Sequence, residues 1–131
     1  MPMSEYGFSR FFLLFLTGGC GALSRYWLGG FVQRIYGGEL PLGTFVINAL
    51  GCLIFGFCWA LADERLVISE ETRLIILTGF VGSFTTFSTF AFESHALMRN
   101  AEWFWAFANV TGQCATGIAA VFAGVFLSRL I

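Results

Sequence analysis

Hydroxyl and phenylalanine side chains alternate in one short stretch of this sequence, residues 79–90. Its phenylalanines recur at every third position from Phe84, so in a helical segment they project from one side. Phenylalanine in an apolar chain usually faces lipid or the protein core, but the hydroxyls between these rings favour another interpretation. A ring edge carries positive potential and a hydroxyl donates hydrogen bonds, which suits a small, partly dehydrated anion. The stretch therefore predicts an anion path along Phe87, Ser88, Thr89 and Phe90.

Two glycines and five serine or threonine residues weaken any helix that residues 79–90 form, although the stretch lies within an apolar segment. At bilayer depth every backbone N–H and C=O needs a partner in the protein or in water. A weakened helix therefore persists there only when it is buried in protein or faces a water-filled path. We expect a broken helix with a functional role at this point.

Polar side chains on two other segments predict the remaining wall of such a path. Thr44 and Asn48 lie one helical turn apart, and the amide of Asn48 offers two N–H donors to an anion. The alternative is that Asn48 only holds helices together by hydrogen bonding between them. A second polar stripe, nearer the end of the chain, comprises Asn109, Gln113, Thr116 and Gly117.

Arg25 and Glu93 are the two charged residues within apolar segments for which the sequence suggests a role. Arg25 follows glycines at positions 18, 19 and 21, and this small-residue face is expected to contact protein. Arg25 either snorkels towards the membrane interface or has a structural role at a pore mouth. Glu93 lies towards the end of the third apolar segment, and we expect the same pore-mouth or structural role for it.

Composition places the chain among membrane proteins, because 57% of its 131 residues are hydrophobic, 11% are charged and the mean hydropathy is +0.79. All seven basic residues are arginine and the formal net charge is −1. This balance supports neither a nucleic-acid partner nor a polybasic lipid anchor. The four cysteines lie in apolar stretches without CxxC spacing, so we expect them to pack as small hydrophobic residues.

Four apolar segments are each close to the roughly 20 residues that cross a bilayer. They predict an all-α integral membrane protein, a single domain over residues 1–131, with four transmembrane helices of which the third is broken. The first segment is too long for a removed signal peptide. The expected helices cover about residues 11–32, 42–62, 72–98 and 103–130.

The arginines are distributed almost evenly between the two ends of these spans. Four lie on the side of the termini and the middle loop, and two lie on the other side with Arg25 near them. So small a positive-inside bias allows insertion in both orientations. Four spans are also few for enclosing a conduction path, so both features favour an antiparallel, dual-topology homodimer with its twofold axis in the membrane plane.

Residues 79–90 (GFVGSFTTFSTF), followed by Glu93, strongly resemble the signature of the Fluc/CrcB fluoride channels. Weaker agreement at residues 43–48 and 21–26 extends the resemblance along the chain. It implies a dual-topology homodimer in the plasma (inner) membrane that exports fluoride passively through two pores. The expected partners are therefore the fluoride ion, the lipid bilayer and a second copy of the chain.

The resemblance also assigns roles to individual residues. Those matched to the fluoride path are two rings, the hydroxyl between them, the pore asparagine and two amides of the last helix: Phe87, Phe90, Ser88, Asn48, Asn109 and Gln113. Thr44 is expected near the asparagine on the same helix face. Gly117 departs from the family's polar track, whose far end is completed here either by Thr116 or by water.

A structural sodium ion is a further implication of the resemblance, with the backbone carbonyls of Gly82 and Thr85 as its ligands. Two symmetric copies would present four carbonyl oxygens and no carboxylate, which suits sodium better than calcium, magnesium or a transition metal. The alternative is that Ser83, Thr86 or water caps these carbonyls and no ion binds.

Two other function classes have less support in the sequence. A small dual-topology, proton-coupled exporter of organic cations would need a protonatable carboxylate, preferably in the first helix, and residues 11–32 contain none. A membrane redox enzyme would need two reactive thiols close together, which the spacing of the cysteines argues against. We therefore expect a channel and not an enzyme.

Overall fold

The computed structural model of the chain describes residues 6–131. Within them the chain is helical apart from short connections, and four helical stretches are long and apolar enough to cross a membrane. This confirms the predicted class, an all-α membrane protein with four spans. The spans are Gly7–Tyr36, Leu42–Asp63, Glu70–Arg99 and Trp103–Ser128.

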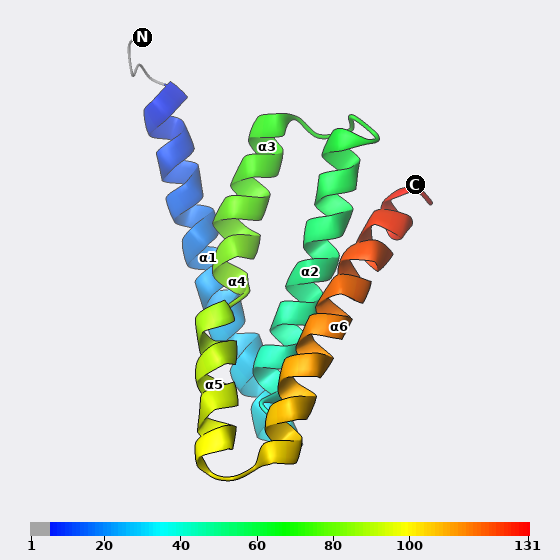
Figure 1. Ribbon diagram of the computed structural model, residues 1–131. Coiled ribbons are helices and arrows are strands. Elements are labelled where there is room, and N and C mark those ends of the chain that lie inside the picture. Colours follow the sequence, from blue (N-terminus) through cyan, green and yellow to red (C-terminus); the bar gives the residue numbers. More distant parts are fainter. Residues whose placement is uncertain (1–5) are drawn as a thin grey trace.

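Seven helical elements make up these four spans (Figure 1). They are α1 (Tyr6–Tyr36), α2 (Leu42–Asp63), α3 (Glu70–Leu74), the π-helical segment η1 (Ile75–Val81), α4 (Gly82–Phe84), α5 (Phe87–Arg99) and α6 (Trp103–Ser128). Helix α1 extends beyond the apolar stretch expected at 11–32, because helical hydrogen bonding continues past the part that a bilayer's hydrocarbon would cover.

The third span changes its backbone geometry three times. It begins at α3, where the Ser69 side chain accepts a hydrogen bond from the Thr72 N–H at 3.2 Å and caps the first turn. In η1 the turns widen, and the Gly82 N–H donates to the Leu77 carbonyl, five residues back. After α4 the backbone at Thr85 is extended, with φ −82° and ψ 159°, so the helical hydrogen-bond ladder stops before α5.

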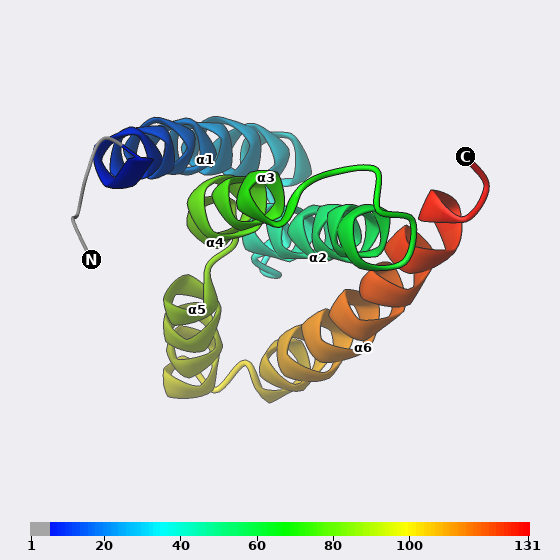
Figure 2. The ribbon, with the colours of Figure 1, turned by 90° about the horizontal axis from the view of Figure 1, so that it is seen from above.

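Helices α2 and α6 pack together along much of their length, while α1 packs against η1, α4 and α2 (Figures 1 and 2). Gly21 brings α1 so close to the third span that a Cβ atom there would overlap the Phe80 carbonyl. Gly18 likewise lies against Ser83, whereas Gly19 has open space beside it. The glycine face of the first helix therefore contacts protein, as predicted, at two of its three positions.

Helix α5 takes a different course from α4. Figure 2 shows it displaced sideways from the α3–α4 part of the same span. Helix α4 packs against α1, whereas α5 packs against α6, and both contact α2. The interruption at Thr85 thus transfers the third span from α1 to α6 and brings its polar residues towards α6, while contact with α2 is kept.

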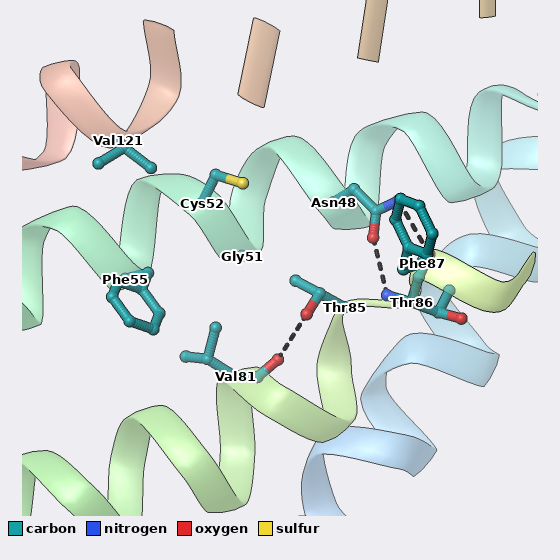
Figure 3. A pocket seen from close by; sticks show the side chains of 9 residues that line it. All are labelled: Asn48, Gly51, Cys52, Phe55, Val81, Thr85, Thr86, Phe87 and Val121. Atoms are coloured by element: carbon teal, nitrogen blue, oxygen red, sulfur yellow. Dashed lines mark hydrogen bonds between the residues drawn. The ribbon is translucent and has the colours of Figure 1, made fainter. Parts of the chain in front are cut away.

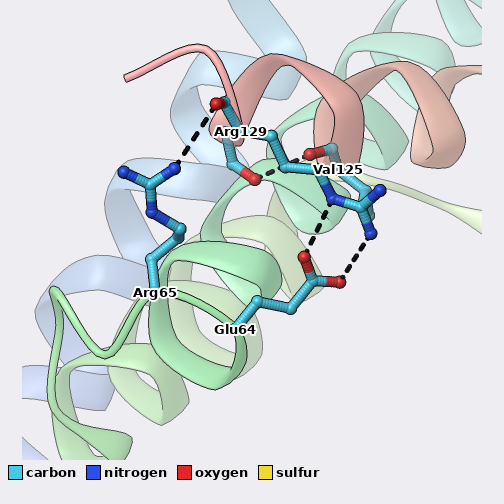
Figure 4. A network of polar contacts seen from close by, with 5 residues as sticks. Glu64, Arg65, Val125 and Arg129 are labelled. Atoms are coloured by element: carbon cyan, nitrogen blue, oxygen red, sulfur yellow. Dashed lines mark hydrogen bonds and ion pairs between the residues drawn. The ribbon is translucent and has the colours of Figure 1, made fainter.

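Ion pairs connect all four spans at the end that carries both termini and the α2–α3 connection. Arg10 of α1 pairs with Glu71 at 3.3 Å, and Arg73 pairs with Asp63 at 3.8 Å. Beyond α2 and α6, Arg129 donates two hydrogen bonds to the Glu64 carboxylate, at 3.0 and 3.1 Å (Figure 4). Each pair is exposed to a considerable extent, so each contributes little to stability.

Candidate functional site

The Asn48 side chain holds the backbone of the third span at its interruption (Figure 3). Its Oδ1 accepts a hydrogen bond from the Thr86 N–H at 2.9 Å, and its Nδ2 donates to the Thr86 carbonyl at 3.3 Å. A side-chain amide has the same donor and acceptor pair as a peptide group, so it can satisfy both backbone groups of one extended residue. The Asn48 side chain therefore supplies the hydrogen bonds that a continuous helix would provide to Thr86.

This contact changes the hydrogen bonding of the nearby carbonyls. In an uninterrupted helix the Thr86 N–H would donate to the carbonyl of Gly82. Here that N–H donates to Asn48, so the Gly82 carbonyl is released from its helical partner. The Thr85 carbonyl accepts a long hydrogen bond, 3.5 Å, from Nη1 of Arg25. Arg25 thus lies at the interruption and contacts its backbone.

A continuous row of hydrogen-bonded side chains leads away from Asn48. Its Nδ2 donates to Oε1 of Gln113 at 2.8 Å, and Nε2 of Gln113 donates to Oδ1 of Asn109 at 2.8 Å. Nδ2 of Asn109 then donates to Oγ of Ser94 at 2.9 Å. Ser94 ends the row by donating to the Phe90 carbonyl at 2.8 Å. We call these four side chains, Asn48, Gln113, Asn109 and Ser94, the amide row.

The amide row brings together three predicted residues and one that the sequence analysis missed. Ser94 was overlooked because a serine inside an apolar helix is common and often bonds its own helix. Its position one turn after Phe90, on the same helix as the ring pair, was the available signal. Asn109 is fully buried and Ser94 nearly so, at 0% and 5% exposure.

A cavity of about 250 Å³ lies beside Asn48 and the interruption (Figure 3). Asn48, Cys52 and Phe55 of α2 line one side, and the third span lines the other. The lining is mostly apolar, with the Asn48 amide and the Thr85 and Thr86 groups as its polar parts. Such a cavity allows a small ion to approach the amide without a full hydration shell.

A second and larger cavity, of about 530 Å³, lies between α1, α2 and α5. Arg25, Thr44, Thr89 and Glu93 are among its lining residues. The Thr44 hydroxyl donates to Oε1 of Glu93 at 2.8 Å, while Oε2 is buried and lacks a hydrogen-bond partner among the described residues. The two predicted pore-mouth residues, Arg25 and Glu93, therefore share one cavity.

The predicted ring pair lies on α5, directly after the interruption. The centroids of Phe87 and Phe90 are 5.6 Å apart with an angle of 52° between the rings. Phe87 is 79% exposed, whereas Phe90 is half-buried. The hydroxyls of Ser88 and Thr89 both lie within hydrogen-bonding distance of the Thr86 hydroxyl, at 3.4 and 2.9 Å. Rings and hydroxyls thus surround the first turn of α5.

Gly117, the position without a side chain in the polar stripe, lies against α2. A Cβ atom built there would be 3.4 Å from Sγ of Cys52. The thiol of Cys52 therefore occupies the space next to the position where a longer side chain would extend the stripe. All four cysteines are free thiols.

Comparison with known proteins relates the chain to one family along most of its length. The family model described as "CrcB-like protein, Camphor Resistance (CrcB)" matches residues 12–125. A relative from Nitrosococcus oceani, named "Fluoride-specific ion channel FluC", is 52% identical over 116 residues, which are 88% of this chain and 93% of the relative. Relatives of the same name are 46% identical in Nitratidesulfovibrio vulgaris (strain Miyazaki F), over 91% of this chain and 96% of the relative, and 47% identical in Solidesulfovibrio magneticus, over 88% and 93%.

Proposed function

Because the chain belongs to the CrcB family, we propose that it is a fluoride-specific ion channel, a multi-pass protein of the plasma membrane through which fluoride leaves the cell passively. The observation that carries the proposal is the similarity to relatives of that name over more than nine-tenths of their length. The matched residues 12–125 include the interruption, the ring pair and every member of the amide row.

The chemistry of the site supports an anion as the transported species. Fluoride is a small, strongly hydrated anion, so a path must replace its water with hydrogen-bond donors and positive ring edges. The amide row, the hydroxyls around Thr86 and the rings of Phe87 and Phe90 supply such groups in one region. At Asn48 an anion must compete with Oε1 of Gln113 and the Thr86 carbonyl for the amide protons.

We also propose that the working unit is an antiparallel homodimer with two pores. Phe87 supports this, because a ring that is 79% exposed in the single chain needs a second surface to complete a path around an ion. The near balance of arginines between the two ends permits both orientations in the membrane.

The residues at the interruption fit a structural sodium ion. The Gly82 carbonyl lacks its helical donor, and the Thr85 carbonyl has a second lone pair beside the one that Arg25 contacts. Two copies would present four neutral oxygens, which suit a hard monovalent cation. When bound, the ion would neutralise the oxygen dipoles and hold the two interruptions together, while Asn48 and Arg25 keep the carbonyls in place.

The proposed function is tested with purified protein in liposomes loaded with fluoride. An ionophore that carries the counter-charge should start rapid fluoride efflux, with much slower efflux from matched liposomes loaded with chloride. Efflux that requires a pH gradient and an organic cation would instead indicate a proton-coupled exporter. Chloride efflux without fluoride efflux would overturn the proposal.

Sodium dependence is tested separately by slow depletion of sodium from the purified protein. Flux should disappear on depletion and return when sodium is restored, without coupled sodium transport. Full activity after verified depletion, in the absence of other monovalent cations, would show that the carbonyls of Gly82 and Thr85 have other partners.

A further inference from the structure

At the buried end of the amide row, the hydroxyl group of Ser94 determines which atoms donate and which accept hydrogen bonds. Ser94 has a single proton, and it donates this proton to the Phe90 carbonyl at 2.8 Å. Its oxygen can therefore offer only lone pairs to Asn109. Because Asn109 is fully buried beside it, the Asn109 amide must direct its NH₂ group, and not its oxygen, towards Ser94.

This constraint passes along the whole row. With its NH₂ group at Ser94, Asn109 directs Oδ1 towards Gln113. Gln113 must therefore donate a hydrogen bond to Oδ1 from its own NH₂ group. Gln113 then directs Oε1 towards Asn48, which must donate from Nδ2 and keep Oδ1 for the Thr86 N–H. The Thr86 N–H cannot accept, so both ends of the row demand the same direction of hydrogen bonding.

We propose that Ser94 is a positioning residue of the fluoride path, which together with the Thr86 N–H at the other end fixes the direction of all three amides although it need not contact the ion. The inference rests on the proposed function for its transport readout. Each amide nitrogen carries two N–H groups and uses one within the row, so the fixed direction keeps nitrogen atoms in defined places along the stripe. Without Ser94 only the Thr86 N–H still directs the row, and the buried NH₂ group of Asn109 loses its acceptor. The row then shifts or partly turns over to pair this group, and a turned amide presents oxygen lone pairs where an anion needs donors.

The test replaces the hydroxyl in graded steps. Ser94→Ala should lower fluoride flux about tenfold, since a buried donor loses its acceptor and the row keeps only one of the two ends that fix its direction. It should also reduce the preference for fluoride over chloride, because fluoride depends more on hydrogen-bond donors. Ser94→Thr keeps a hydroxyl that can bond the carbonyl four residues back, and flux should stay within about twofold of wild type. Ser94→Cys preserves the volume with a weak S–H group, and it should fall between the two.

Ser128→Ala is the matched control. Ser128 is fully buried and its hydroxyl donates to the Val125 carbonyl at 2.7 Å, so the same atoms are removed away from the amide row. Flux and selectivity should remain within about twofold of wild type. An equal loss in Ser128→Ala and Ser94→Ala would reduce Ser94 to a general packing residue and overturn the proposal.

A spectroscopic readout tests the direction of the row independently of transport. The chain has three asparagines and two glutamines, so ¹⁵N labelling of side-chain amides gives few signals. Ser94→Ala should shift the NH₂ signals of Asn109, Gln113 and Asn48, and those of Asn100 and Gln33 should stay unchanged. A shift confined to Asn109, or wild-type flux in Ser94→Ala, contradicts the proposed role of Ser94 and leaves the proposed channel function unaffected. Absence of fluoride flux in the wild type contradicts the proposed function, and the amide signals still decide the role of Ser94.

Discussion

Asn48 can have both of the roles that its sequence position allows, an amide of the pore and a contact between helices. In the structure its acceptor and donors are engaged by Thr86 and Gln113. It therefore holds the interruption and lies on the proposed path at the same time. Fluoride can interact with this amide only by displacing a neutral oxygen, and such an exchange favours an anion over water because a charged acceptor makes the stronger hydrogen bond.

At the residue scale we predict that Phe87→Ile and Phe90→Ile each lower fluoride flux on the order of two- to tenfold, equivalent to about 0.4–1.4 kcal/mol. The apolar volume changes little, whereas the positive ring edge is lost. Phe92→Ile is the control, because Phe92 lies on the same helix with 70% exposure but outside the ring pair. Efflux from fluoride-loaded liposomes is the measurement. Normal flux in both ring variants, or an equal loss in the control, would show that the rings do not face the ion.

At the scale of elements, close packing of α2 on α6 supports the amide row, which joins these two helices. Two glycines permit this approach, Gly56 against the Val121 carbonyl and Gly124 against the Leu53 carbonyl. Small residues are the usual means by which membrane helices bring their backbones together. The distance between Asn48 and Gln113 therefore depends on residues that are remote from the path.

Gly124→Ala should lower stability by about 1–3 kcal/mol, because the added methyl group would overlap the backbone of α2. Gly19→Ala is the matched control in another span. A Cβ atom at Gly19 has nothing within 4 Å, so this variant should be neutral or slightly more stable. Thermal unfolding in detergent measures both. Equal stability of the two variants would contradict the close packing of α2 and α6.

The ends of α2 and α6 are also joined by the pair of Glu64 and Arg129. Hydrogen bonds from the Arg129 guanidinium hold the pKa of Glu64 below its ordinary value. A lowered folded-state pKa means that the stabilisation is present above about pH 4.3, where an unfolded glutamate is charged, and is lost as the pH falls through the folded-state value.

We predict that Glu64→Gln lowers the unfolding temperature slightly at neutral pH, and that the difference from wild type shrinks as the pH falls below about 4. The effect is small because the pair is exposed. Glu39→Gln, in the connection between α1 and α2, provides the comparison. A difference that grows towards acid pH has the wrong sign for this pair and would exclude it.

At the scale of the whole molecule, the termini and the α2–α3 connection lie at one end and share the ion pairs, while the second cavity opens among residues near the other end. A single chain therefore has two different ends. In an antiparallel pair each membrane face would carry one end of each kind, so the two faces would be equivalent. The small difference in arginine number between the two ends agrees with this arrangement.

A terminal tag on the wild-type protein in cells should be accessible from both sides of the membrane. In Arg34→Gln/Arg99→Gln the remaining arginines lie mostly at the end of the termini, so insertion should shift to one orientation, with the termini inside. Fluoride flux should fall with it, because antiparallel pairs can no longer form. A single orientation of the wild type would contradict the dual-topology dimer.

The sequence by itself determined the class of the protein, the number of its spans and its family, because hydropathy summed over about 20 residues and a contiguous motif are local properties. It also marked Asn48, Asn109, Gln113 and the phenylalanines as candidates for the path. Only the tertiary structure decided their partners. Asn48 meets Thr86 and Gln113 across 38 and 65 positions, and Asn109 meets Ser94 across 15. Such pairs depend on how far each helix is rotated and tilted against its neighbours, which helical periodicity leaves open and interhelical packing fixes.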